Sequence, residues 1–95
     1  MAVYFVLQID WKTEAALHQH AGGLSHLIEK HGGRSIVASK DFQRLEATWK
    51  PGRRTVIEFP SVESFRSWYD PEEYRPLRTF RLQRSESDAV VTTGL

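Results

Sequence analysis

No cysteine occurs in the chain, and no apolar run approaches the roughly 20 residues that span a bilayer. Disulfides, thiol nucleophiles and thiolate metal sites are therefore excluded. An excess of one charge is also lacking, since 13 lysines and arginines against 12 aspartates and glutamates give a formal net charge of +1, too balanced for nucleic-acid binding. The first residues, MAVYFVLQID, lack the basic and apolar segments of a signal peptide. These absences predict a soluble, cytoplasmic protein with no membrane or nucleic-acid partner.

The composition predicts a single folded domain over residues 1–95. Hydrophobic residues make up 40% of the chain and charged residues 26%, which is typical of globular rather than disordered proteins. A chain of this size buries only about 60–65% of its unfolded surface, so a partner subunit often supplements such a core.

Two hydrophobic periods divide the chain into strands and helices. Alternating apolar and polar residues predict strands over residues 3–11, 34–39, 43–49, 54–59 and 88–93. Apolar residues at helical spacing predict a helix over residues 13–31, capped by Thr13, and a second helix that Ser61 caps. If residues 43–49 are an elaboration, the remaining order is the split βαβ arrangement of an α+β, ferredoxin-like sandwich. Helices cover only one sheet face in that fold, so we expect a homodimer that pairs the two free faces.

The chain also carries a set of short motifs: HGGR at 31–34, W-x-P-x-R at 49–53, IEFPS at 57–61, WYDPEEY at 68–74 and the following Arg78. In combination they resemble domain-of-unknown-function family 1330. That family is similar to the dimeric α/β barrel superfamily, which includes cofactor-independent monooxygenases, muconolactone isomerases and dye-decolorising haem proteins. The resemblance implies a homodimeric ferredoxin-like barrel, and it implies no assigned activity. Leu17 and His20 stand where we expect aromatic residues from the family pattern, which changes the lining of any pocket beneath the first helix.

All the histidines of the chain lie on the first predicted helix, at positions 18, 20, 26 and 31. At 100° per residue they do not converge on one point, so we expect no metal site. His20 falls within the apolar stripe and should point toward the core. Two interpretations are open for it: a packed, hydrogen-bonded histidine, or a general acid or base in a pocket.

Glu58 stands in the middle of an otherwise apolar strand, between Ile57 and Phe59. A buried carboxylate needs a cationic partner. The candidates for that partner are Arg34, Arg53, Arg78 and Arg81. The alternative to a structural ion pair is a desolvated carboxylate that transfers protons.

Aromatic rings and arginines are concentrated in residues 65–81, FRSWYDPEEYRPLRTFR. Phe65 and Tyr69 share a helix face and are predicted to be core, whereas Trp68 lies about 60° away and should border a cleft. At least one of Arg78 and Arg81 should approach the core side, where it needs an anion. Glu58 is the first candidate for that anion and a ligand carboxylate the second.

Three functional hypotheses follow. The first is a small-molecule binding protein whose ligand, aromatic or anionic, occupies a pocket between sheet and helices, with no cofactor. The pocket would be lined by Tyr4, His20, Trp49, Glu58, Trp68, Tyr74 and Arg78. The second, by analogy with the superfamily alone, is a cofactor-free isomerase or monooxygenase acting on an aromatic or lactone compound, with His20 or Glu58 moving the proton. The third is a structural homodimer that holds no ligand and has no cavity.

Overall fold

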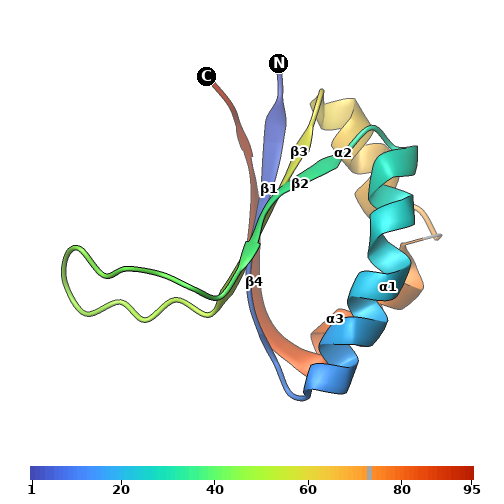
Figure 1. Ribbon diagram of the computed structural model, residues 1–95. Helices are drawn as coiled ribbons and strands as arrows, with labels where there is room; N and C mark the ends of the chain where they lie inside the picture. The colour runs from blue at the N-terminus through green and yellow to red at the C-terminus, as the bar shows by residue number, and fades with distance from the viewer. Residues whose placement is uncertain (73) are drawn as a thin grey trace.

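A four-stranded antiparallel sheet forms one layer of the protein and the helices form the other (Figure 1). The computed structural model describes residues 1–72 and 74–95, and of residues 19–25 it describes the backbone alone. The elements are β1 (Val3–Trp11), α1 (Glu14–Lys30), β2 (Arg34–Ser39), β3 (Arg53–Phe59), α2 (Val62–Tyr69), α3 (Arg75–Arg84) and β4 (Ser85–Thr93). The strand order β2-β3-β1-β4 with this connectivity is ferredoxin-like, as the sequence predicted. No helix of the described residues is long and apolar enough to cross a membrane.

The alternation along β1 assigns one set of side chains to each face of the sheet. Val3, Phe5, Leu7 and Ile9 are buried beneath the helices, while Tyr4, Val6 and their neighbours face the other way. Aromatic rings of α2 close the core from the helix side. The ring centroid of Trp68 lies 5.5 Å from that of Phe5 and 5.3 Å from that of Phe59. Burial of these large rings is the main source of stability in a domain of this size.

Capping side chains mark the starts of α1 and α2, and a glycine marks the end of α1. Thr13 Oγ1 accepts a hydrogen bond from the backbone N–H of Ala16 at 3.1 Å, and Ser61 Oγ accepts one from Ser64 at 3.1 Å. Gly32 ends α1 with a φ of +79°, which favours glycine. The next residue is also a glycine, and a Cβ at Gly33 would lie 2.6 Å from the ring of Phe59, too close for any larger residue. The HGGR motif thus ends the helix and lets the backbone pass close to the core.

The predicted strand over residues 43–49 is wrong. Residues 40–52 instead form an extended arm that projects from the end of β2 and β3, away from the helices (Figure 1). β1 and β2 occupy both edges of β3, and residues 40–52 do not pair with the free outer edge of β2. Ala47 has a left-handed φ of 58°, which interrupts the alternation, and Leu45 and Trp49 are exposed.

Candidate functional site

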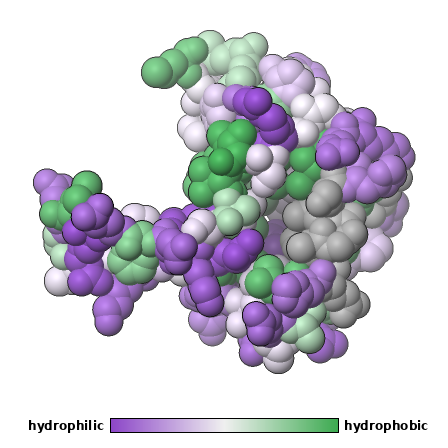
Figure 2. Space-filling model, in the orientation of Figure 1, coloured by the Kyte–Doolittle hydropathy of each residue, from purple (hydrophilic) through white to green (hydrophobic). Residues whose placement is uncertain are grey.

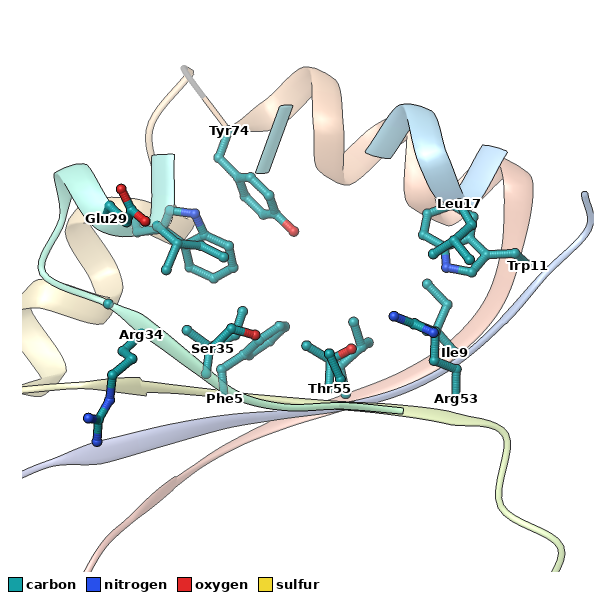
Figure 3. A pocket seen from close by; sticks show the side chains of 16 residues that line it. Phe5, Ile9, Trp11, Leu17, Glu29, Arg34, Ser35, Arg53, Thr55 and Tyr74 are labelled. Carbon is teal, nitrogen blue, oxygen red and sulfur yellow. The ribbon is translucent and has the colours of Figure 1, made fainter. Parts of the chain in front are cut away.

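A cavity of about 420 Å³ lies between the sheet and the helices (Figure 3). Its volume falls within the range of about 300–1,000 Å³ that is usual for small-molecule sites. The lining residues come from the sheet and from the helices and are mostly apolar: Phe5, Leu7, Ile9, Trp11, Leu17, Ile28, Glu29, Gly33, Arg34, Ser35, Ala38, Arg53, Thr55, Ile57, Trp68 and Tyr74.

The floor of the cavity follows from the strand alternation. Phe5, Leu7 and Ile9 of β1 lie beside Ile57 and Thr55 of β3 in the register of the antiparallel pair. These are the positions that face the helices. The covered face of the sheet therefore provides an apolar floor rather than a filled core.

The roof of the cavity is aromatic at one end and carries the Tyr74 hydroxyl there. Trp68 and Tyr74 are both buried, and their ring centroids lie 4.4 Å apart. The hydroxyl of Tyr74 points into the cavity (Figure 3). Burial away from water raises the pKa of Tyr74 above its ordinary value of 10.0, and the nearby Arg81 guanidinium partly opposes that effect. Within the described part of the chain, the buried indole Nε1 of Trp68 has no hydrogen-bond partner.

Arg53 contributes a cation at the other end of the cavity, beside Trp11 and Leu17 (Figure 3). Its place follows from the period of β3, in which residues 53, 55, 57 and 59 face the helices. The side chain is partly buried, and no ion pair joins it to the described residues. From the sequence, Arg53 was expected only as a candidate partner of Glu58, because the predicted strand began at residue 54, whereas β3 begins at Arg53.

Glu58 and Tyr4 lie on the opposite face of the sheet and do not line the cavity. The Tyr4 hydroxyl donates to Glu58 Oε2 at 2.8 Å, and Arg34 Nη2 donates to Glu58 Oε1 at 2.9 Å. The three residues sit directly across from one another on β1, β3 and β2, at positions that face away from the helices. The hydrogen bond to Glu58, and then the negative charge of Glu58, raise the pKa of Tyr4. The predicted ion pair of Glu58 is confirmed with Arg34, and the expected placement of Glu58 and Tyr4 in the pocket is corrected by the register.

The remaining predicted site residues are dispersed. Trp49 is 65% exposed on the arm, because the segment that carries it does not pair with the sheet. Arg78 Nη1 donates to the backbone oxygen of Tyr69 at 3.1 Å, and its guanidinium lies 5.0 Å from the centre of the Tyr69 ring. It is a packing contact outside the cavity lining. The side chain of His20 lies outside the part of the chain that the structure describes. The cavity thus brings together Trp68 and Tyr74 from the predicted set.

Arg81 is the arginine of α3 that turns inward, as one of Arg78 and Arg81 was predicted to do. It is 2% exposed, and its Nη1 donates to Ser87 Oγ at 3.1 Å. The prediction that Glu58 pairs with this arginine was wrong, because Glu58 lies on the opposite face of the sheet and forms its ion pair with Arg34. Among the described residues the Nε of Arg81 has no hydrogen-bond partner.

The described residues contain no group of histidine, aspartate and glutamate side chains placed to hold a metal ion. His18 and His26 are exposed on α1. His31 Nδ1 lies 3.0 Å from Ser67 Oγ, within hydrogen-bond distance. These side chains therefore belong to the helix surface rather than to the cavity.

Comparison with known proteins places the chain in a family. The family model described as "Domain of unknown function (DUF1330)" matches residues 2–95. No curated protein matches the chain. A protein of unknown function from Rhodopseudomonas palustris superposes with a TM-score of 0.78 at 15% identity, covering 99% of this chain and 82% of that one.

Two further solved structures share the fold at low identity. SnoaB, a cofactor-independent oxygenase from Streptomyces nogalater, gives a TM-score of 0.73 at 14% identity, covering 99% of this chain and 93% of that chain. A dimeric ferredoxin-like protein of unknown function from Jannaschia sp. CCS1 gives 0.74 at 10% identity, covering 99% and 100%. At these identities the likeness establishes the ferredoxin-like fold alone.

Proposed function

The chain belongs to the DUF1330 family, for which no function is assigned, and from the geometry of its site we propose that this protein binds a small aromatic or anionic molecule between sheet and helices. One observation carries the proposal: a mostly apolar cavity of about 420 Å³ lies between sheet and helices, with Phe5, Trp68 and Tyr74 in its lining. A space of this size with few polar groups is the usual form of a small-molecule site. The cavity also argues against the hypothesis of a purely structural homodimer, because that hypothesis predicts no cavity.

The test of this proposal uses the Trp68 indole as its reporter. Titration with 1-naphthol should shift the Nε1–H resonance of Trp68 in proton–nitrogen NMR spectra. Calorimetry measures the affinity of the variants, and Trp68→Phe should weaken binding about tenfold through loss of ring contact. The exposed Trp49 on the arm supplies the internal control, and Trp49→Phe should leave the affinity unchanged. If 1-naphthol and related two-ring compounds leave the Trp68 resonance in place, the cavity does not bind such molecules.

A homodimer formed through the open face of the sheet is the second part of the proposal. Its support is a row of valines that runs across every strand of the sheet on that face. Val56 lies across from both Val37 and Val6, and Val6 lies across from Val90. Val6 is 36% exposed and Val90 61% exposed. A contiguous apolar stripe between polar rows is typical of a protein interface, and a second copy presents a matching stripe.

The arm over residues 40–52 adds to this surface. It projects on the side of the sheet that the helices leave open (Figure 1), and Figure 2 shows it standing apart from the body with apolar groups among hydrophilic ones. Leu45 is 84% exposed and Phe42 49% exposed. A second copy bound to the valine stripe would lie beside the arm. That copy would cover the exposed side chains of Leu45 and Phe42.

A cofactor-independent oxygenase is the second candidate function. It is favoured by the likeness in fold to SnoaB together with the phenol of Tyr74 at the wall of the cavity. Because Glu58 faces away from the cavity, His20 stays the predicted proton acceptor for this reaction. Dioxygen uptake with 1-naphthol, above the rate without protein and reduced in Tyr74→Phe, is the expected result. Binding without dioxygen uptake would favour the binding protein over the oxygenase.

A further inference from the structure

Arg53 is a cation on the cavity wall that no residue of the described chain neutralises. The other charged residues of the wall differ from it: Arg34 is paired with Glu58, and Glu29 is exposed on α1 at the far end (Figure 3). Arg53 also borders a second, more open hollow, which Asp10, Glu14, Lys12 and Lys40 line with it. Neither carboxylate of that hollow forms an ion pair with Arg53.

The surroundings of Arg53 inside the cavity are apolar. Ile9, Trp11 and Leu17 line the same end (Figure 3), so that a guanidinium there is removed in part from water. A partly desolvated arginine is stabilised by an anion, and its planar fork fits a carboxylate with two parallel hydrogen bonds. A single guanidinium matches the single charge of a carboxylate better than the two charges of a phosphate monoester.

The opposite end of the cavity is aromatic and carries a hydroxyl group. Phe5, Trp68 and Tyr74 line it, and the Tyr74 hydroxyl points into the cavity (Figure 3). A flat ring fits against these side chains by offset stacking or edge contacts. The two ends together select a molecule that is apolar and flat at one end and negatively charged at the other.

We propose that the ligand is an aromatic carboxylate, with its ring against Trp68 and Tyr74 and its carboxylate held by Arg53. This inference rests on the proposed function and adds the chemical class of the ligand. The second, more open hollow borders Arg53, and there Lys12 and Lys40 balance the charges of Asp10 and Glu14.

The experiment compares 2-naphthoate with its neutral isostere 2-naphthamide, with binding followed at the Trp68 indole resonance. The wild-type protein should bind 2-naphthoate about tenfold more tightly than 2-naphthamide, the usual size for hydrogen bonds to a charged group. Arg53→Gln should remove this preference by weakening 2-naphthoate alone. Arg53→Lys, which keeps the charge but not the fork, should retain part of it.

Arg54→Gln is the matched control, since the same charge is removed one residue away on the opposite face. The Arg54 guanidinium donates to the backbone oxygens of Gly52 and Asp41 at the base of the arm, outside the cavity lining. The preference for 2-naphthoate should survive this change.

The possible failures are distinguishable. Equal affinity of the two probes for the wild-type protein, or an undiminished preference in Arg53→Gln, would overturn the role of Arg53 and leave the binding function standing. Resonance shifts confined to Trp49 would indicate a surface site on the arm and overturn the inference. If neither probe nor 1-naphthol shifts the Trp68 resonance, the proposed function is contradicted together with the inference that rests on it.

Discussion

The two faces of the sheet are made by alternate residues of the same strands, yet they differ in how their polar groups are satisfied. On the open face, Tyr4, Glu58 and Arg34 bond to one another across neighbouring strands. On the covered face, no ion pair joins Arg53 to the described residues. A surface whose polar groups are paired already suits contact with another folded surface, whereas an unpaired cation on a cavity wall suits a ligand that supplies an anion.

The largest expected effect is a difference in the free energy of unfolding between variants of the buried and the exposed face. Phe59→Ala should lower the free energy of unfolding by about 3–5 kcal/mol, because the ring is fully buried at the centre of the aromatic core. Val90→Ala, at an exposed position of the open face, should change it by less than about 1 kcal/mol in the isolated subunit. Urea denaturation at a protein concentration at which the subunits are separate checks both values. Similar losses for the two variants would contradict the assignment of the core to the covered face.

The next effect concerns assembly through the open face. Val6→Lys introduces a charge into the centre of the valine stripe, and in a symmetric pair two such charges meet. We expect the dissociation constant of the dimer to rise about 100-fold, since like charges at an interface cost several kcal/mol. Light scattering of micromolar protein should then give the monomer mass.

Val62→Lys is the control for this prediction, because Val62 is an exposed valine on α2, away from the stripe. It should leave the dimer intact. A monomeric wild-type protein under the same conditions would rule out the proposed homodimer, and an unchanged dimer in Val6→Lys would place the interface elsewhere.

A smaller effect appears at alkaline pH. Burial raises the pKa of Tyr74 in the folded state above its ordinary value of 10.0, so its contribution to stability is complete below about pH 10 and is lost as the pH rises through the folded pKa. The wild-type protein should therefore lose more stability between pH 9 and 11 than Tyr74→Phe does. Tyr4→Phe, on the open face where solvent screens the charge, should reduce this loss by less. Chemical denaturation at both pH values provides the measurement.

The smallest effect is expected at the ion pair of the open face. Arg34 is 72% exposed and Glu58 28% exposed, so Glu58→Gln should cost only about 0.5–1 kcal/mol in the isolated subunit. A double-mutant cycle with Arg34→Gln isolates the coupling between the two side chains. A coupling of zero at low salt would show that the contact adds nothing to stability, and a much larger value would mean that the pair is covered in the dimer.

Most of the fold was predictable from residues that are close together in the chain. The alternation of β1 and the caps at Thr13 and Ser61 were read correctly, since each depends on contacts within a few residues. The arm shows the limit of such patterns. Residues 43–49 alternate like a strand, but they pair with no strand of the described sheet, and strand pairing depends on contacts between separate segments of the chain.

The ferredoxin-like order of elements and the burial of Phe65 could be read from the sequence alone. The sequence did not predict that Trp68 is buried more deeply than Tyr69, or which charged residues form pairs, because both depend on the assembled fold. Glu58 joined Arg34 rather than Arg53 or Arg81 because strand register placed them directly across from one another on the open face. The same register left Arg53 beneath the helices with an unpaired charge. Periodicity assigns a residue to a face, but its neighbours there come from distant parts of the chain, and their identity is set when the strands pair.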